Sequence, residues 1–276
     1  MADPKGFPLK DNATHTAAEH YERYSALLMA PFVTAALDAA DLFPGAHVLD
    51  LACGTGFVAR AAAAQVGPTG HVVAVDLLEG MLRIAARNAP RMYPDIEFTQ
   101  ASADKLPYPD DSFDAIVCQQ GVQYFPDLAA ALTEAARVTR PGGRFTATAW
   151  TPPADRSPYF AAQLKAVTDH GTPEAEARFA ASLSCTADRL TDALTTAGFH
   201  DITTREVTFA IAFPDLADFA SGHLAADPWG RSIEEAGGPA RFTEAAETTR
   251  EALAPHTSPD GSATLPFTTT LATATR

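Results

Sequence analysis

Cysteine is scarce in this sequence. The 276 residues include three cysteines, Cys53, Cys118 and Cys185, which lie far apart and never in a CxxC spacing. This pattern argues against a disulfide framework and against a cysteine-ligated zinc site. Because the chain also lacks an HExxH sequence or another clustered metal-ligand spacing, we expect no metal site. A reducing cytoplasm fits this composition.

Positive charge and long apolar runs are also in short supply. The chain has 20 Lys and Arg against 34 Asp and Glu, a formal net charge of -14. Such a charge repels phosphate groups, so we expect neither a nucleic acid nor an anionic membrane as partner. The most apolar early stretch, residues 26–40, is interrupted by Pro31 and Asp38, and the first ten residues do not resemble a signal peptide. We expect a soluble protein.

Between about residues 46 and 150, short β-branched segments alternate with longer Ala- and Leu-rich segments, as is typical of parallel βαβ units. The expected strands are 47–51, 71–76, 96–100, 113–118 and 143–150. The expected helices are 56–66, 78–88 and 128–139, the last closed by Arg-Pro-Gly-Gly at 140–143. We therefore predict an α/β fold with a doubly wound, mostly parallel sheet.

After Trp150 the pattern becomes less regular. Residues 151–183 begin with Thr-Pro-Pro and predict an irregular helical cap segment. Residues 184–276 return to the sheet, with a helix at 186–197 and strands at 203–213 and 264–275. A polar helical insertion at about 215–255 separates those two strands, so both caps interrupt one sheet.

The most informative segment is Val-Leu-Asp-Leu-Ala-Cys-Gly-Thr-Gly at residues 48–56, a buried strand that runs into a glycine turn before a helix. Small residues at such a turn let backbone N–H groups approach a ligand, although glycine needed only for packing is the alternative. About twenty residues later, Asp76 ends the next strand, where its carboxylate can accept hydrogen bonds from both hydroxyls of a ribose. Together the loop and the acid predict a nucleoside cofactor.

Residues 54–59 also satisfy the dinucleotide pattern GxGxxA. A pyrophosphate at this turn would lie near Asp50, and two like charges about 4 Å apart repel by roughly 4 kcal/mol at an effective dielectric constant of about 20. A ligand with an ammonium and a sulfonium group is attracted instead. The charge of Asp50 therefore favours S-adenosyl-L-methionine over a nicotinamide dinucleotide.

Five motifs together resemble the class I S-adenosylmethionine-dependent methyltransferases, in the branch of the ubiquinone/menaquinone-biosynthesis methyltransferases. The motifs are VLDLACGTG (48–56), VVAVD (72–76), ASADKLPYPDDSFD (101–114), CQQGVQYFPD (118–127) and RVTRPGGRF (137–145). The resemblance covers about residues 46–150, the cofactor-binding core. It implies a Rossmann-like sheet of seven strands with the last one reversed, and an N-terminal helical lid at residues 1–45.

The resemblance also implies roles for individual residues. The backbone around the methionine part of the cofactor would be that of Ala52, Cys53 and Gly54. Asp76 would bind the ribose, and the adenine would be bordered by Leu77, Ser102 and Ala103. Gln119 and Gln120 would lie near the reactive methyl group. The lid would close over the cofactor through Tyr21 and Tyr24, or these two rings would only anchor the helix to the core.

Two positions depart from the family pattern. Ala52 stands where the family has its first loop glycine, so one methyl group must fit beneath the cofactor. Ser102 stands where the family usually has Asp before Ala103. Because a hydroxyl brings no charge to the hydrogen bond with the adenine amino group, we expect that contact to be about 1 kcal/mol weaker.

Methyl transfer needs no covalent nucleophile, but an acceptor that must lose a proton benefits from a general base. His223 is the candidate base, and the alternative, which its polar surroundings favour, is an exposed side chain without a catalytic role. Residues 118–121, Cys-Gln-Gln-Gly, lack the Asp/Asn-Pro-Pro-aromatic sequence typical of enzymes that methylate nucleic-acid bases. We therefore expect a small-molecule acceptor, natural-product-like or quinone-like, methylated on oxygen or carbon.

Two other functional hypotheses stay open. One is a protein that binds S-adenosylmethionine without transferring its methyl group, as a sensor or as a scaffold for a rearrangement. The other is a nicotinamide-dependent dehydrogenase, which the charge of Asp50 disfavours. The sequence leaves the oligomeric state undetermined.

Overall fold

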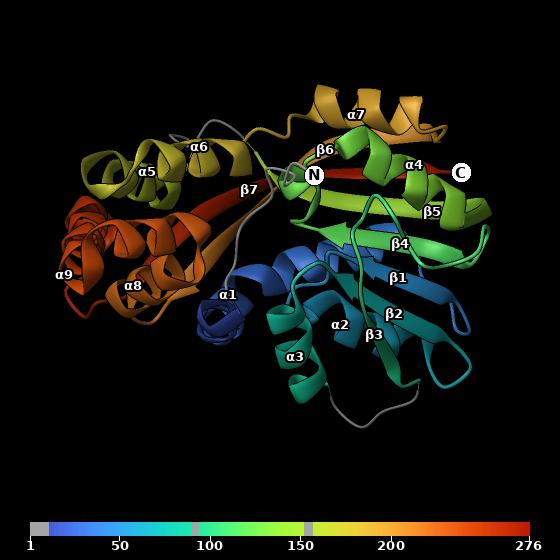
Figure 1. The fold of residues 1–276 in the computed structure, drawn as a ribbon, viewed down its shortest axis with the longest axis horizontal. Helices are drawn as coiled ribbons and strands as arrows, with labels where there is room; N and C mark the ends of the chain where they lie inside the picture. Colours follow the sequence, from blue (N-terminus) through green and yellow to red (C-terminus); the bar gives the residue numbers. More distant parts are fainter. Residues whose placement is uncertain (1–10, 90–93, 152–156) are drawn as a thin grey trace.

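One seven-stranded sheet runs through the computed structural model, which describes residues 11–89, 94–151 and 157–276 (Figure 1). Its strands are β1 (His47–Leu51), β2 (His71–Asp76), β3 (Ile96–Gln100), β4 (Phe113–Gln119), β5 (Thr139–Trp150), β6 (His200–Phe213) and β7 (Ala263–Thr275). They are ordered β3-β2-β1-β4-β5-β7-β6, and β7 is antiparallel to both neighbours while all other pairs are parallel. The predicted α/β sheet with a reversed last strand is confirmed.

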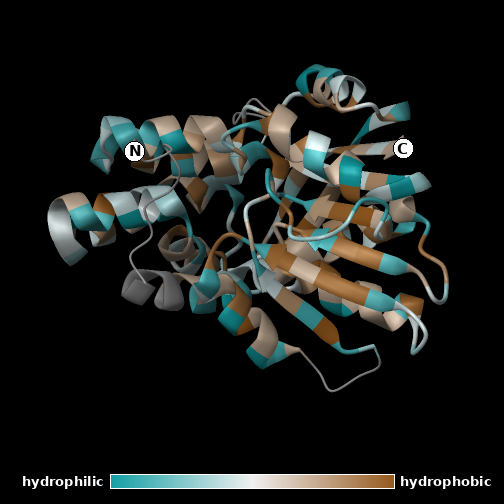
Figure 2. Ribbon diagram, turned by 45° about the vertical axis from the view of Figure 1, so that its right-hand side comes forward, coloured by the Kyte–Doolittle hydropathy of each residue, from teal (hydrophilic) through white to brown (hydrophobic). Residues whose placement is uncertain are grey.

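Helices cover both faces of this sheet (Figure 1). One face carries α1 (Asp11–Ala40), α2 (Phe57–Val66) and α3 (Glu79–Asn88), and the other carries α4 (Leu128–Val138) and α7 (Ala187–Thr196). Within β1, Val48 packs in the hydrophobic cluster of the first face, whereas Leu49 and Leu51 pack in that of the second. The strand is apolar almost throughout because its alternating side chains are buried on both faces. The apolar strands stand out as the brown centre of Figure 2.

Four further helices pack together beyond the end of the parallel strands (Figure 1). These cap helices are α5 (Pro158–His170), α6 (Pro173–Ser182), α8 (Leu216–Ala226) and α9 (Pro228–Leu253), followed by the short η3 (Ala254–His256). Strands β6 and β7 reach into the cap, since pairing of β5 with β7 ends at Trp150 and Thr269 but pairing of β6 with β7 continues to Phe213 and Ala263.

Some elements begin or end elsewhere than predicted, and in one case a contact distant in sequence is involved. The helix expected to reach residue 139 ends at Val138, and β5 begins at Thr139 and includes the Arg-Pro-Gly-Gly turn. Gly142 N donates to Arg276 O at 2.7 Å, so the C-terminal residue holds this turn against the sheet edge. The irregular helix expected at 157–183 is two helices, separated at Gly171 and restarted by the Thr172 side chain, which accepts from Ala175 N.

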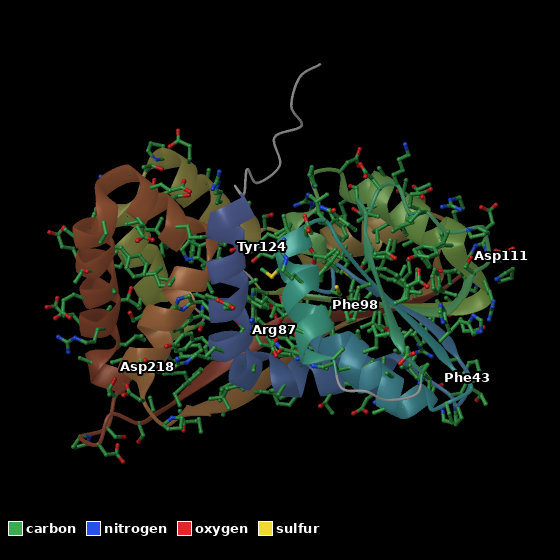
Figure 3. The ribbon with its side chains drawn as sticks, turned by 60° about the horizontal axis from the view of Figure 1, so that its bottom comes forward. Phe43, Arg87, Phe98, Asp111, Tyr124 and Asp218 are labelled. Atoms are coloured by element: carbon green, nitrogen blue, oxygen red, sulfur yellow. The ribbon has the colours of Figure 1, made fainter. Side chains whose placement is uncertain are left out.

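The N-terminal helix α1 covers most of the predicted lid, residues 1–45, of which residues 1–10 lie outside the described part. Its inner face is core, with Leu28, Phe32 and Leu37 fully buried. Arg87 on α3 lies beside α1 (Figure 3), where its Nη1 forms an ion pair with Glu19 at 2.9 Å. α1 also packs against α8, so this helix joins the sheet to the cap.

Candidate active site

A pocket opens at the carboxyl ends of β1, β2 and β4 and is closed by α1, the segment around η1 (Val122–Tyr124) and the start of α9. Sheets of this kind bind ligands at this edge, where adjacent loops diverge. Of the site residues predicted from the sequence, the pocket is lined by Tyr21, Ala52, Cys53, Gly54, Asp76, Leu77, Ser102, Ala103, Gln119 and Gln120. The structure thus brings these residues together, while Tyr24 and His223 lie elsewhere.

The loop after β1 is built by residues with left-handed backbone angles. Ala52 has φ 60° and Gly54 φ 54°, and Gly56 at φ 83° directly precedes α2. Cys53 N donates to Val75 O at 2.9 Å, which fixes the loop to β2. A Cβ atom added to Gly54 would stand 3.7 Å from Cε1 of Tyr21, so the glycine keeps a space between the loop and this ring.

The methyl group of Ala52 is accommodated by a second glycine. A Cβ atom added to Gly121 would stand 2.8 Å from Cβ of Ala52 and 2.7 Å from Sγ of Cys118. Gly121 therefore provides the room that Ala52, in place of the family's glycine, requires. This compensation lies in the segment after β4 and was not predicted from the sequence.

Asp76 joins the loop to the end of β2. Its Oδ2 accepts from Gly54 N at 2.8 Å and its Oδ1 from Leu78 N at 2.9 Å. Burial raises the pKa of this carboxyl group above its ordinary value, against the opposing effect of these backbone hydrogen bonds. Each oxygen keeps a lone pair for a further donor, so the group is held in place and can still accept from a diol.

Asp50, also in the pocket wall, is 1% exposed, and its Oδ2 accepts from Ala59 N at 2.8 Å. Burial raises the pKa of this carboxyl group to about 8, and the nearby charge of Asp76 acts in the same direction. A full negative charge on Asp50 is the expectation from the sequence. In the ligand-free protein at neutral pH, this carboxyl group is instead mostly protonated. A cation bound beside Asp50 would favour its ionised form, and a pyrophosphate would oppose it.

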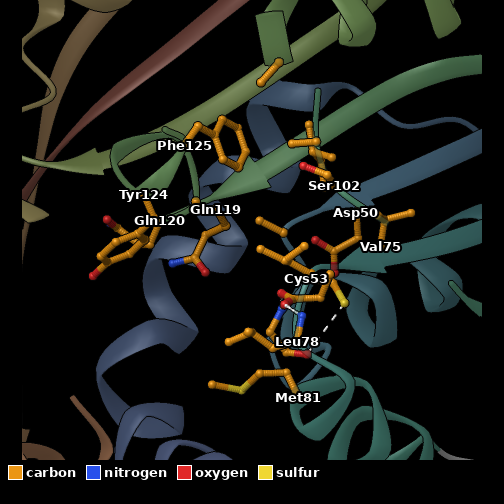
Figure 4. A pocket seen from close by; sticks show the side chains of 18 of the residues that line it. Asp50, Cys53, Val75, Leu78, Met81, Ser102, Gln119, Gln120, Tyr124 and Phe125 are labelled. Atoms are coloured by element: carbon orange, nitrogen blue, oxygen red, sulfur yellow. Dashed lines mark hydrogen bonds between the residues drawn. The ribbon is translucent and has the colours of Figure 1, made fainter. Parts of the chain in front are cut away.

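The segment after β4 forms the wall opposite the glycine loop. In Figure 4, Gln120 and Tyr124 lie across the pocket from Asp50 and Ser102. Gln120 has φ 55°, and its backbone N donates to Thr148 O at 3.0 Å, which turns its side chain away from the strand. Its Oε1 accepts from Gln123 Nε2 at 3.1 Å, whereas its Nε2 is buried with no hydrogen-bond partner among the described residues. This wall therefore offers an unused donor.

Of the two predicted lid tyrosines, Tyr21 lines the pocket and Tyr24 does not. Its ring packs against Phe57 with centroids 6.1 Å apart, and burial raises the pKa of its hydroxyl group, helped by the charge of Asp227. Tyr24 instead donates to Asp218 Oδ1 at 3.3 Å and packs against Gly222 in α8. Tyr24 is therefore an anchor between α1 and the cap, because residues three apart on a helix diverge by about 60°.

His223 is buried, at 5% exposed, so the alternative of an exposed side chain is wrong. Its ring lies between Phe219 and Tyr159, and its Nδ1 is 3.1 Å from Asp227 Oδ2. That oxygen accepts from Gln163 Nε2 at 3.0 Å, whereas both ring nitrogens of His223 are buried without a hydrogen-bond partner among the described residues. Asp227 lines the pocket whereas His223 does not, so the histidine is separated from the pocket and lies beside one of its wall residues.

Several residues of the site were missed in the sequence. Tyr124 and Phe125 stand in the quoted motif 118–127 and were detectable as aromatic residues directly after a central strand. Asp227 and Arg231, at the start of α9, carried no comparable signal, because nothing local to residues 215–255 indicates which turn of the cap faces the sheet.

Two further kinds of feature are not found among the described residues. Within residues 11–89, 94–151 and 157–276, no group of three His, Cys, Asp or Glu side chains is placed to hold a metal ion. No helix in the described part of the chain combines the length and the apolar character needed to cross a membrane.

Comparison with known proteins shows which family the residues of the glycine loop and of the parallel strands resemble. Residues 48–143 match the family model described as "Methyltransferase domain". The demethylmenaquinone methyltransferase of Symbiobacterium thermophilum is 42% identical over 104 residues, which cover 37% of this chain and 41% of that protein. The nocamycin O-methyltransferase of Saccharothrix syringae is 35% identical over 183 residues, 62% of this chain and 65% of that protein. The chain thus matches less than two thirds of the length of these relatives.

Among solved structures, the YcgJ protein from Bacillus subtilis is similar with a TM-score of 0.56. The sequences are 19% identical, and the similarity covers 88% of this chain and 97% of that one. At this identity the similarity concerns the fold, which extends beyond the matched domain into the cap.

Proposed function

Residues 48–143 form a class I methyltransferase domain, and we propose that the chain is an S-adenosylmethionine-dependent methyltransferase acting on a small molecule. The observation that carries this proposal is the pairing of Asp76 with the Gly54 backbone at the edge of the sheet. It ties a ribose acceptor to the loop that faces the methionine part of the cofactor.

S-adenosylmethionine is the cofactor, and when bound it supplies an electrophilic methyl group on a positively charged sulfur. The residues present fit it, since Asp76 has free lone pairs for the ribose hydroxyls and Asp50 is a buried acid whose ionised form a cation stabilises. Leu77, Ser102 and Ala103 border the space for the adenine. Ala52, Cys53 and Gly54 enclose the amino-acid part, and Tyr21 covers it from α1.

The acceptor is proposed to occupy the part of the pocket between Tyr124 and the start of α9. Aromatic side chains there, Tyr21, Tyr124 and Phe125, suit a flat, partly apolar molecule. The names of two relatives, a demethylmenaquinone methyltransferase and a nocamycin O-methyltransferase, support a quinone-like or natural-product-like acceptor and methylation on carbon or oxygen. The net charge of -14 supports an acceptor other than a nucleic acid.

The protein's own work in this reaction is positioning and exclusion of water, which in enzymes can lower a barrier by roughly 7 to 11 kcal/mol. Gln119 and Gln120 stand at the boundary between the two halves of the pocket. We assign to His223 the role of a positioning residue that holds or accepts a proton beside Asp227. We also place the protein in a reducing cytoplasm, in keeping with Cys53, Cys118 and Cys185, which are buried and unpaired.

A two-step experiment tests the proposal. Calorimetric titration with S-adenosylhomocysteine should show binding that NADH does not compete with. Incubation with methyl-labelled S-adenosylmethionine and a panel of phenols, enols and hydroquinones should then yield labelled product. Absence of S-adenosylhomocysteine binding contradicts the proposal, and binding without labelled product in any pool supports the alternative of a cofactor-binding protein that does not transfer methyl.

A further inference from the structure

The pocket wall is unbalanced in charge. Among its described lining residues there are five carboxyl groups, those of Asp50, Asp76, Asp104, Asp127 and Asp227. The same lining includes one guanidinium group, that of Arg231, and no lysine or histidine. The role of this single positive side chain in an otherwise acidic wall is therefore of interest.

Arg231 is in the first turn of α9 and is partly buried. Its Nε atom is buried without a hydrogen-bond partner, and its side chain forms no hydrogen bond or ion pair with another described residue. Burial lowers the pKa of this guanidinium group, although an arginine stays charged in proteins. A buried donor without a hydrogen-bond partner is costly, so this partly buried guanidinium in the pocket wall marks a place where a ligand can supply the missing acceptor.

Nearby side chains do not remove this positive charge. The charge of Asp227, one turn earlier, acts on Arg231, but its Oδ2 accepts from Gln163 Nε2 at 3.0 Å and the two side chains form no ion pair. Arg178 on α6 donates to Ser232 Oγ at 3.0 Å, and its positive charge helps to lower the pKa of Arg231. Glu235 is the other acid that acts on Arg231, and it does not line the pocket. Arg231, at the start of α9, is thus the one positively charged side chain among the described residues that line the pocket.

The start of α9 belongs to the acceptor half of the pocket. Asp50 and Asp76 lie at the glycine loop, where the cofactor is proposed to bind. Tyr21 lines the pocket between the two halves. The charges of Asp227, Asp76 and Asp50 all raise the pKa of its hydroxyl group, in addition to the larger effect of burial. Burial raises the pKa of the Tyr124 hydroxyl group, and the nearby Asp227 and Tyr21 act in the same direction. Arg231 therefore faces the second substrate rather than the ribose and adenine.

We propose that Arg231 binds an ionised oxygen of the methyl acceptor, so that the acceptor class is small organic acids, with a carboxylate or an ionised acidic hydroxyl group. This inference rests on the proposed methyltransferase function. The planar fork of N–H donors on a guanidinium group matches two oxygens of an acid. A neutral molecule of the same shape would bring no negative charge to the guanidinium group of Arg231. The other source of the same chemistry is the cofactor's own carboxylate, which the test must distinguish.

The test uses the full chain loaded with S-adenosylhomocysteine and titrated with salicylate and with its neutral amide, salicylamide. The wild-type protein should prefer salicylate by about 10- to 150-fold, the range that corresponds to a charged hydrogen bond. Arg231→Gln should abolish this preference and leave S-adenosylhomocysteine affinity unchanged, and Arg231→Lys should keep part of the preference. Arg250→Gln, which removes an equal charge from an exposed position on the same helix, should behave as wild type.

Several results would overturn the inference. They are equal binding of the two probes by the wild-type complex, no binding of salicylate, or retained preference in Arg231→Gln. Weaker S-adenosylhomocysteine binding by Arg231→Gln, with an unchanged melting temperature, assigns the arginine to the cofactor's carboxylate and also overturns it. Failure of the wild-type protein to bind S-adenosylhomocysteine at all is a different outcome, because it contradicts the proposed function itself.

Discussion

The side chain of Asp76 and the backbone N–H of Gly54 are joined by a hydrogen bond of 2.8 Å that connects the ends of β2 and β1. The same carboxyl group accepts from Leu78 N at 2.9 Å, so both of its oxygens are oriented before any ligand arrives. A preoriented acceptor loses less conformational freedom on binding than a mobile one. This geometry and that of the neighbouring groups support five predictions.

Asp76→Ala should weaken S-adenosylhomocysteine binding by about 1.5 to 3 kcal/mol, the contribution of hydrogen bonds to a charged group. The loss has two causes, since the ribose loses its acceptor and the Gly54 loop loses its tether. Calorimetry measures the affinity, and thermal unfolding separates a folding defect from a binding defect. Asp192→Asn, at an exposed position on α7 outside the pocket, is the control and should bind normally. Unchanged affinity in Asp76→Ala would argue strongly against the assignment of the site.

Affinity for S-adenosylmethionine should increase as the pH rises from about 6 to about 8. The pKa of Asp50, which burial raises to about 8, leaves this carboxyl group mostly protonated below that pH, and only the ionised form attracts a cation. Binding should therefore release a proton, which calorimetry detects by comparing buffers of different ionisation enthalpy. Asp50→Asn should show a flat pH profile. Proton uptake on binding, or affinity that falls over this range, would contradict the role of Asp50.

The same raised pKa predicts the opposite trend for the stability of the ligand-free protein. Between its ordinary pKa of 3.8 and about 8, Asp50 binds more protons in the folded than in the unfolded state. The free energy of unfolding should therefore contain a contribution from Asp50 that falls as the pH rises through this window and levels off above it. Urea denaturation at several pH values, with Asp50→Asn as the reference, isolates this contribution. A contribution that rises with pH would be inconsistent with the buried carboxyl group.

Ala52→Gly should raise the free energy of unfolding by about 0.5 to 1 kcal/mol, because a left-handed backbone costs a residue with a Cβ atom roughly 1–2 kcal/mol and glycine's extra chain entropy offsets part of that gain. Gly121→Ala should lower it by about 1 to 3 kcal/mol, since the new Cβ would overlap Cβ of Ala52 and Sγ of Cys118. The double variant should recover part of the loss, as measured by urea denaturation of all four proteins. Strict additivity of the two changes would mean that the two positions are not in contact.

His223→Phe should lower kcat by about 100-fold, near the lower end of what a positioned acid or base contributes, while S-adenosylhomocysteine affinity stays unchanged. Phenylalanine preserves the packing between Phe219 and Tyr159 but has no atom to hold a proton beside Asp227. The pH profile of kcat should lose one limb in the variant. A variant with normal kcat and an unaltered profile would show that His223 serves only packing.

Much of the fold was predictable because its causes are local. The apolar strand at 47–51 and the glycine turn after it are both visible in consecutive residues. By contrast, the start of β5 depends on the pairing of Thr139 with Phe113 of β4 and on the hydrogen bond between Gly142 and Arg276. No window of neighbouring residues contains these contacts, so the strand was predicted to begin only at residue 143.

The site divides in the same way. The chemistry of its cofactor half follows from the order and spacing of residues on the glycine loop and on β2, since parallel strands bring their carboxyl ends to one edge. The sequence alone therefore determined the sheet, the cofactor class and the proposed place of the cofactor. The tertiary structure decided the protonation of Asp50, the burial of His223 and the presence of Arg231 in the wall. These properties depend on which turn of the cap faces the sheet and on how completely water is displaced from it, and packing between distant segments sets both.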